Sequence, residues 1–195
     1  MNLGGIYKDL GNLDQALAST LKSLELKPDN PTALINLGGI YKDLGNLDQA
    51  LASTLKSLEL NPDNPDALIN LGGIYKDLGN LDQALASTLK SLELNPDNPT
   101  ALINLGGIYK DLGNLDQALA STLKSLELKP DNPGALTNLF SSYGEGDLPV
   151  LKSMARRALE HNPEILNDLT YIEALSSLGK DFVNDIIPTT ASINW

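Results

Sequence analysis

Asparagine recurs at one position of a repeated stretch of the chain, at Asn36, Asn70 and Asn104, which are 34 residues apart. A primary amide has both a donor and an acceptor, so such a row could hold the backbone amides of an extended peptide without contacting its side chains. Alternatively, the asparagines are solvated or bond the adjacent repeat. A glycine on the same helical face, Gly39 in the first case, predicts open space beside the row.

Three further rows share the 34-residue spacing. The isoleucines either form an apolar stripe for a partner's side chains or pack against the neighbouring repeat, and we favour partial burial, because exposed isoleucine lowers solubility. The lysines and aspartates are typical of a solvated charged face, in which surface pairs contribute little, although they could set partner preference. With the asparagines, the candidate peptide-binding residues are therefore Ile35, Ile69, Ile103, Lys42, Lys76, Lys110, Asp43, Asp77 and Asp111.

The sequence shows no arrangement of residues typical of a catalytic site. His161 is the only histidine, next to an Asn-Pro pair at a predicted helix end, where a cation complements the helix dipole. The carboxylates recur once per repeat, which favours caps and solvated faces over a catalytic site. The paired glycines lie inside a predicted helix with no strand before them, unlike a phosphate-binding loop. We predict neither an enzyme nor a cofactor or metal site.

The composition favours a protein partner. The 195 residues carry a net charge of −11, which disfavours nucleic acid and anionic membranes. The chain has no cysteine, so it forms no disulfide or thiolate metal site. It has no apolar run long enough to span a membrane and no signal-peptide pattern at its start. We expect a soluble, cytoplasmic protein.

Each 34-residue unit predicts a helical hairpin. Asn64 and Pro65 supply an N-cap and a proline for the first turn of the first helix, here the A helix. Gly79 ends that helix in the left-handed conformation, and Asn80 with Gln83 forms a capping box for the second, the B helix. One hairpin cannot bury its own apolar face, so successive hairpins must stack.

Helical geometry divides the A helix into two sides. The predicted core side carries Leu34, Leu37, Gly38, Tyr41 and Leu44. The opposite side carries Thr32, Ile35, Gly39, Lys42 and Asp43, with Asn36 at its edge. On the B helix, a smooth outer surface is predicted from Ala52, Ser53, Ser57 and Leu55, as a weaker candidate for a second contact face.

The unit resembles a tetratricopeptide repeat (TPR), because its residues fall on the signature positions of that family: Leu34, Leu37, Gly38, Tyr41, Gly45, Ala50 and Pro62. Thr54 and Ser57 depart from the pattern and suggest a slimmer packing surface on the B helix. The resemblance implies an all-α, right-handed solenoid whose A helices line a concave groove. The asparagine row itself resembles the asparagine ladder of the O-linked N-acetylglucosamine transferases, where the ladder holds the substrate backbone.

The repeats predict three segments. Residues 1–132 hold four near-identical units, of which the first begins within its A helix. Residues 133–163 form a degenerate fifth unit, with Phe140 in place of a glycine, a shortened turn, and Pro149 near the start of its second helix, so we expect an altered hairpin angle. Residues 164–195 are predicted to form a capping helix and a flexible tail.

Three functions fit this pattern. The first is a scaffold that binds an extended peptide or a partner helix in the groove. The second is the substrate-recruiting arm of a larger glycosyltransferase or sulfotransferase. The third is head-to-tail self-association through an uncovered first repeat.

Overall fold

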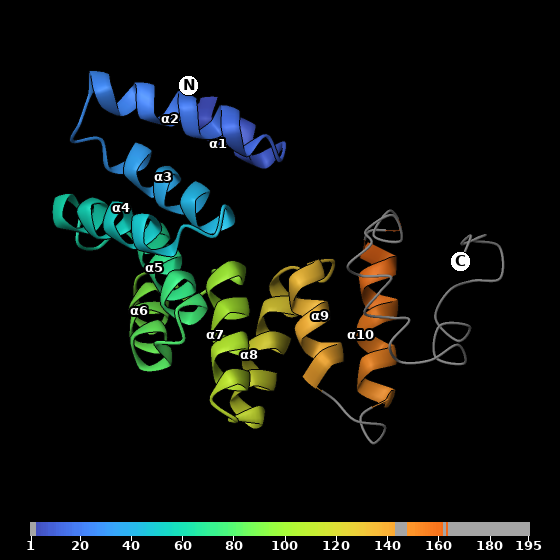
Figure 1. Ribbon diagram of the computed structural model, residues 1–195. Helices are drawn as coiled ribbons and strands as arrows, with labels where there is room; N and C mark the ends of the chain where they lie inside the picture. The colour runs from blue at the N-terminus through green and yellow to red at the C-terminus, as the bar shows by residue number, and fades with distance from the viewer. Residues whose placement is uncertain (1–2, 143–147, 162, 164–195) are drawn as a thin grey trace. The chain divides into compact units, whose positions relative to one another are not determined.

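The computed structural model describes residues 3–142, 148–161 and 163. Over these residues the fold is helical, and Figure 1 shows the helices in chain order. They are α1 (Leu3–Asp9), α2 (Leu13–Leu26), α3 (Pro31–Asp43), α4 (Leu47–Leu60), α5 (Pro65–Asp77), α6 (Leu81–Leu94), α7 (Pro99–Asp111), α8 (Leu115–Leu128), α9 (Pro133–Ser142) and α10 (Leu148–His161).

The chain divides into two compact units, Met1–Pro96 (unit 1) and Asp97–Trp195 (unit 2). Unit 1 contains three successive hairpins, α1/α2, α3/α4 and α5/α6, drawn from blue to green in Figure 1. Each hairpin contacts the next through its B helix and also through its A helix. In unit 2, α8 and α7 both contact α9, and α10 contacts α9. The prediction of stacked helical hairpins is confirmed.

Each full-length A helix begins as the sequence predicts. Oδ1 of Asn64 accepts hydrogen bonds from the backbone N–H groups of Asp66 at 3.0 Å and Ala67 at 3.1 Å. Pro65 follows in the first turn, where its missing N–H costs nothing. Asn98 caps α7 in the same way, whereas Oδ1 of Asn30 accepts only from the backbone N–H of Ala33, at 3.3 Å, at the start of α3.

The turn between the two helices differs from the prediction in one respect. Gly79 has φ +78°, as predicted for the end of α5. The backbone N–H of Gly79 donates to Lys76 at 2.9 Å, and that of Asn80 donates to Tyr75 at 2.8 Å, which is the Schellman arrangement. The predicted capping box is wrong, because the side chain of Asn80 makes no capping bond. The N–H that Gln83 would have accepted is already bonded to the carbonyl of Tyr75.

The A and B helices of a hairpin meet through small side chains. A Cβ placed on Gly38 would collide with Oγ1 of Thr54 and lie 3.3 Å from the carbonyl oxygen of Ala50. Ser57 is fully buried, and its Oγ donates to the carbonyl of Pro31 at 3.0 Å. The predicted outer surface is therefore wrong for Ser57, because this side chain faces the A helix instead of solvent.

The core side of the A helix largely agrees with the prediction. On α3, Leu34, Leu37 and Gly38 are buried and Tyr41 is half-buried, as is Leu44 directly after the helix. The sequence prediction missed Ile40, which is fully buried.

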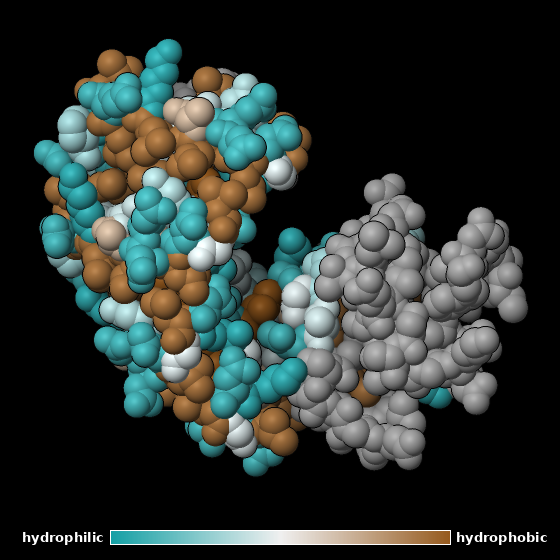
Figure 2. Space-filling view, viewed as in Figure 1, coloured by the Kyte–Doolittle hydropathy of each residue, from teal (hydrophilic) through white to brown (hydrophobic). Residues whose placement is uncertain are grey.

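Exposed leucines recur along the B helices of unit 1, at Leu21, Leu55 and Leu89. Figure 2 shows hydrophobic and hydrophilic side chains interspersed over the visible surface of this unit.

Part of the C-terminal prediction lies outside the described residues. This applies to the capping helix and tail at 164–195 and to the shortened turn, which includes 143–147. Pro149 lies in the first turn of α10, as predicted, and His161 is the last residue of that helix. The segment boundaries at 132 and 163 remain predictions.

Candidate functional site

The candidate residues form one side of the A helices, which we name the A-helix face. In unit 1 it consists of Ile35, Asn36, Lys42 and Asp43 on α3, the equivalent residues Ile69, Asn70, Lys76 and Asp77 on α5, and Lys8 on α1. In unit 2 it consists of Ile103, Asn104, Lys110 and Asp111 on α7 and Asn138 on α9.

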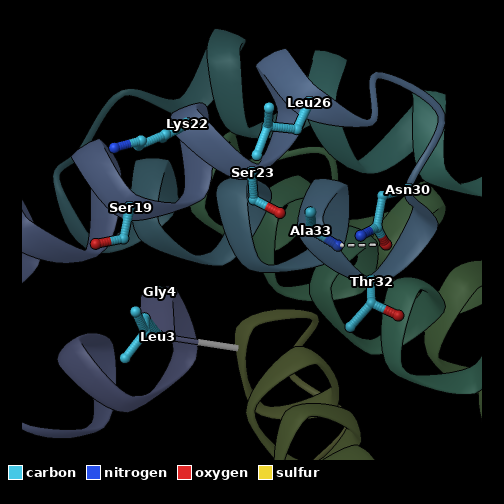
Figure 3. Close-up of a pocket in the computed structure, with 9 residues that line it drawn as sticks. All are labelled: Leu3, Gly4, Ser19, Lys22, Ser23, Leu26, Asn30, Thr32 and Ala33. Atoms are coloured by element: carbon cyan, nitrogen blue, oxygen red, sulfur yellow. Dashed lines mark hydrogen bonds between the residues drawn. The ribbon is translucent and has the colours of Figure 1, made fainter. Parts of the chain in front are cut away.

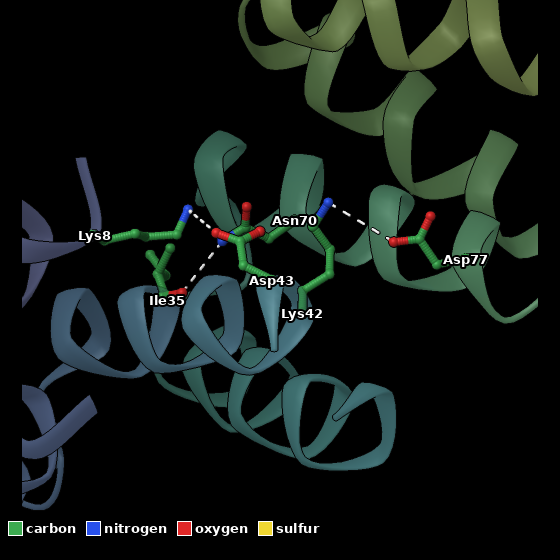
Figure 4. A network of polar contacts seen from close by, with 6 residues as sticks. All are labelled: Lys8, Ile35, Lys42, Asp43, Asn70 and Asp77. Atoms are coloured by element: carbon green, nitrogen blue, oxygen red, sulfur yellow. Dashed lines mark hydrogen bonds and ion pairs between the residues drawn. The ribbon is translucent and has the colours of Figure 1, made fainter. Parts of the chain in front are cut away.

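Asparagine joins neighbouring repeats on this face. Nδ2 of Asn70 donates to the carbonyl oxygen of Ile35 at 3.2 Å, as Figure 4 shows. In unit 2, Nδ2 of Asn138 donates to the carbonyl oxygen of Ile103 at 3.3 Å. The sequence left open whether the asparagines are solvated, bond the adjacent repeat or bind a peptide, and at Asn70 and Asn138 the bond to the adjacent repeat is observed. The ladder's binding of a ligand remains a prediction.

Asn36 has different surroundings from Asn70. Its Nδ2 is buried and has no hydrogen-bond partner among the described residues. The carbonyl that would be equivalent to that of Ile35 belongs to Met1, which lies outside the described residues. Asn104 is half-buried on α7.

The charged rows are also joined between repeats in unit 1. Nζ of Lys8 lies 3.2 Å from Oδ2 of Asp43, and Nζ of Lys42 lies 3.8 Å from Oδ2 of Asp77 (Figure 4). The side chains are about a third exposed or more, so the pairs are screened by solvent. Because each lysine is matched by an aspartate of the next repeat, these pairs add no net charge to the A-helix face.

The space predicted beside the asparagine row is filled by a lysine. Gly39 is buried. A Cβ on it would lie 3.2 Å from Cε and 3.3 Å from Nζ of Lys8, and 3.7 Å from Nδ2 of Asn70. The prediction of open space at Gly39 is wrong, because the side chain of Lys8 runs across the glycine to reach Asp43.

The isoleucine row is partly buried, as predicted. Ile69 is 7% exposed, whereas Ile35 and Ile103 are half-buried. These side chains thus offer a ligand only part of their apolar surface.

Two residues of the A-helix face were missed at the sequence level. Lys8 belongs to the incomplete first repeat and Asn138 to the degenerate fifth, and both were left out of the candidate set. Their spacing was the available signal, since Lys8 precedes Lys42 and Asn138 follows Asn104 by the same 34 residues.

A pocket of about 560 Å³ lies beside α1, and Figure 3 shows the side chains that line it. Among them is Ser23, whose equivalent in the next repeat is Ser57. Because Ser57 bonds the carbonyl of Pro31, the first turn of α3 occupies the corresponding place in that repeat. The pocket therefore corresponds in position to the first turn of α3 in the next repeat, and we assign no small-molecule ligand to it.

Neither a metal centre nor a membrane span is found in the described part of the chain. No group of three or more potential ligands is arranged there to hold a metal ion. None of the described helices combines the length and the apolar character that crossing a bilayer requires.

Stacked hairpins joined by repeated side-chain bonds define a helical-repeat scaffold. The family model described as "TPR repeat" matches residues 4–45, 38–79 and 72–113, and that described as "Tetratricopeptide repeat" matches residues 99–132. Together the matches span about two thirds of the chain, from residue 4 to residue 132. The chain belongs to the tetratricopeptide repeat family, whose members generally mediate protein–protein interactions.

Solved structures agree with this membership. TTC0263, a thermophilic TPR protein of Thermus thermophilus, is 27% identical with a TM-score of 0.79, over 90% of this chain and 95% of that one. Pseudomonas aeruginosa PilF is 22% identical with a TM-score of 0.71, over 94% and 84% of the respective chains. A chain of the APC/C hetero-tetramer Cut9–Hcn1 is 20% identical with a TM-score of 0.72, over 89% of this chain and 35% of that one. The last two show the fold alone. No curated protein sequence matches the chain.

Proposed function

We propose that this protein is an interaction scaffold whose A-helix face binds an extended segment of a partner protein. The asparagine row contacts the backbone of that segment, and the lysine, aspartate and isoleucine rows contact its side chains. The proposed binding residues are Asn36, Asn70, Asn104, Ile35, Ile69, Ile103, Lys42, Lys76, Lys110, Asp43, Asp77 and Asp111.

The observation that supports this proposal most is the hydrogen bond between Asn70 and Ile35. It holds the amide in one orientation and uses only one of its two N–H groups. The second N–H and Oδ1 belong to a half-buried side chain and are chemically suited to pair with a peptide group. Because the packed repeats already hold the side chain in one orientation, ligand binding does not include the entropy cost of ordering it.

The ion pairs suit a partner of mixed sequence. Lys8 with Asp43 and Lys42 with Asp77 present both signs of charge without a net excess. The balanced charges select neither an acidic nor a basic partner sequence. The asparagines can bond to the main chain of any sequence, so we expect the partner to be held by its main chain.

The test is binding to an array of extended peptides of varied sequence. The native chain is compared with the triple variant Asn36→Ala, Asn70→Ala, Asn104→Ala. The matched control is Ser57→Ala, Ser91→Ala, Ser125→Ala, which removes the hydrogen bonds to Pro31, Pro65 and Pro99 away from the A-helix face. Each lost bond lowers the free energy of unfolding by about 1 kcal/mol in either variant, measured by circular dichroism.

We expect the native chain and the serine variant to bind many peptides and the asparagine variant to bind few. Absence of binding by the native chain contradicts the proposal. So does equal binding by the native chain and the asparagine variant, or an equal loss in the two variants.

A further inference from the structure

The B helix α2 exposes a surface that its copies in the later repeats bury. The helices α2, α4, α6 and α8 have the same sequence, LDQALASTLKSLEL, so a difference between them reflects what packs on them. Ser23 on α2 is half-buried and lines the pocket beside α1, whereas the equivalent serines of the other three helices are fully buried. Leu26 is 84% exposed, whereas its equivalents on α4, α6 and α8 are 42–44% exposed.

The segment that covers this surface in the later repeats has a common sequence, Asp-Asn-Pro-x-Ala-Leu, where x is threonine or aspartate. In each repeat the serine Oγ donates to the proline carbonyl, in the pairs Ser57–Pro31 at 3.0 Å, Ser91–Pro65 at 3.0 Å and Ser125–Pro99 at 3.1 Å. In two repeats the lysine directly before the serine pairs with the aspartate, as Lys90–Asp63 at 3.3 Å and Lys124–Asp97 at 3.5 Å. One hydroxyl and one ammonium group of the B helix therefore contact this segment.

The same two groups line the pocket on α2. They belong to Lys22 and Ser23 (Figure 3), and neither side chain forms a hydrogen bond or an ion pair within the described residues. Leu3 contributes apolar wall and is 54% exposed, although its equivalent Leu37 is 7% exposed. The volume of about 560 Å³ lies in the range of ligand sites in proteins.

We infer that this pocket docks an Asp-Asn-Pro-x-Ala-Leu segment of a partner protein, at a site separate from the A-helix face. Ser23 donates to the proline carbonyl, Lys22 pairs with the aspartate, and the apolar side chains of the segment cover the exposed wall. Proline fixes φ for the first helical turn, which lowers the entropy cost of docking. A second copy of this chain is a poorer occupant, because its own four segments of this kind already begin the helices α3, α5, α7 and α9.

The experiment titrates the isotope-labelled full chain with a blocked heptapeptide, Pro-Asp-Asn-Pro-Thr-Ala-Leu, and follows the backbone amide signals by NMR. A scrambled peptide of the same composition is the control ligand. The variant is Lys22→Gln with Ser23→Ala. Its matched control is Lys56→Gln with Ser57→Ala, which makes the same changes in the identical sequence of α4, where the first turn of α3 already covers the site.

We expect the heptapeptide to shift the signals of Ser19, Ser23 and Ala33, which line the pocket. The native chain and the α4 variant should bind it alike, and the α2 variant about tenfold more weakly, because a hydrogen bond and an exposed ion pair are lost. Replacing the aspartate of the peptide by asparagine should weaken binding to the native chain and leave binding to the α2 variant unchanged.

Three results overturn the inference: no shifts at the pocket, equal binding of the scrambled peptide, or an equal dissociation constant for the two variants. Shifts at the pocket that grow with protein concentration in the absence of peptide also overturn it, in favour of a second copy of the chain as the occupant.

Discussion

The two adjacent glycines of α3 have different surroundings although the sequence presents them as a pair. Gly38 faces α4, where the nearest atoms to an added Cβ include the backbone of Ala50 and the buried side chain of Thr54. Gly39 faces the neighbouring repeat, where the nearest atoms belong to the flexible end of Lys8. The backbone of Ala50 and the buried side chain of Thr54 cannot move easily, whereas the end of the Lys8 side chain can.

Alanine at these two positions should therefore change stability in opposite directions. In Gly39→Ala, the lysine end moves aside and the helix gains about 0.5–1 kcal/mol of propensity, so the free energy of unfolding should rise or stay level. In Gly38→Ala, overpacking of about 1–3 kcal/mol should exceed that gain and destabilise the protein. Urea denaturation followed by circular dichroism measures both changes.

A second substitution tests the cause at Gly38. Adding Thr54→Ala to Gly38→Ala removes the Oγ1 that the new methyl group would meet, so much of the lost stability should return. A Gly38→Ala variant as stable as the native chain would contradict this account.

At the scale of the helix, asparagine precedes both helices of the α3/α4, α5/α6 and α7/α8 hairpins, but its side chain caps only the A helix. Asn64 accepts two backbone N–H groups at the start of α5. Asn80 accepts none at the start of α6 and instead donates its backbone N–H to Tyr75. The same residue type therefore performs two roles, through its side chain in one case and its main chain in the other.

This difference predicts that removing the side chains of Asn64 and Asn80 lowers the free energy of unfolding by different amounts. Asn64→Ala should lower the free energy of unfolding by about 1 kcal/mol, because it leaves two N–H groups without a protein acceptor. Asn80→Ala should cost less than about 0.5 kcal/mol, because the alanine backbone makes the same bond to Tyr75. Thermal unfolding of the two variants measures the difference, and equal shifts in melting temperature would show that Asn80 caps α6 after all.

At the scale of the molecule, stability in a repeat array depends on how many neighbours cover each hairpin. In unit 1, the α3/α4 hairpin contacts hairpins on both sides. In the α1/α2 hairpin, Leu3 is 54% exposed and Ile6 is 43% exposed, although their equivalents Leu37 and Ile40 are buried. The first hairpin therefore lacks part of the apolar contact that the second has.

Amide hydrogen exchange should reveal this difference. The sequences of α2 and α4 are identical, LDQALASTLKSLEL, so their intrinsic exchange rates are the same and any difference reflects position in the array. We expect slower exchange in α4 than in α2, measured by mass spectrometry. Equal protection would mean that unit 1 opens as one cooperative body. The proposals of a substrate-recruiting arm and of head-to-tail association remain predictions at this scale.

The sequence by itself determined the features that depend on local chemistry. The 34-residue spacing, the Asn-Pro starts of the A helices and the glycines at the hairpin turns predicted the helices and their pairing. These succeed because N-caps, proline in the first turn and positive φ are set by residues a few positions apart. The same spacing also placed the asparagine, lysine, aspartate and isoleucine rows on one side of the A helices.

Only the tertiary structure decided what those side chains contact. Asn70 reaches a carbonyl 35 residues earlier, Lys8 fills the space beside Gly39, and Ser57 faces Pro31. Each of these contacts joins two helices, so it depends on the distance and rotation between them, which the periodicity of one helix does not contain. The sequence thus showed which residues form the A-helix face, and packing between helices decided which of their polar atoms bond within the protein.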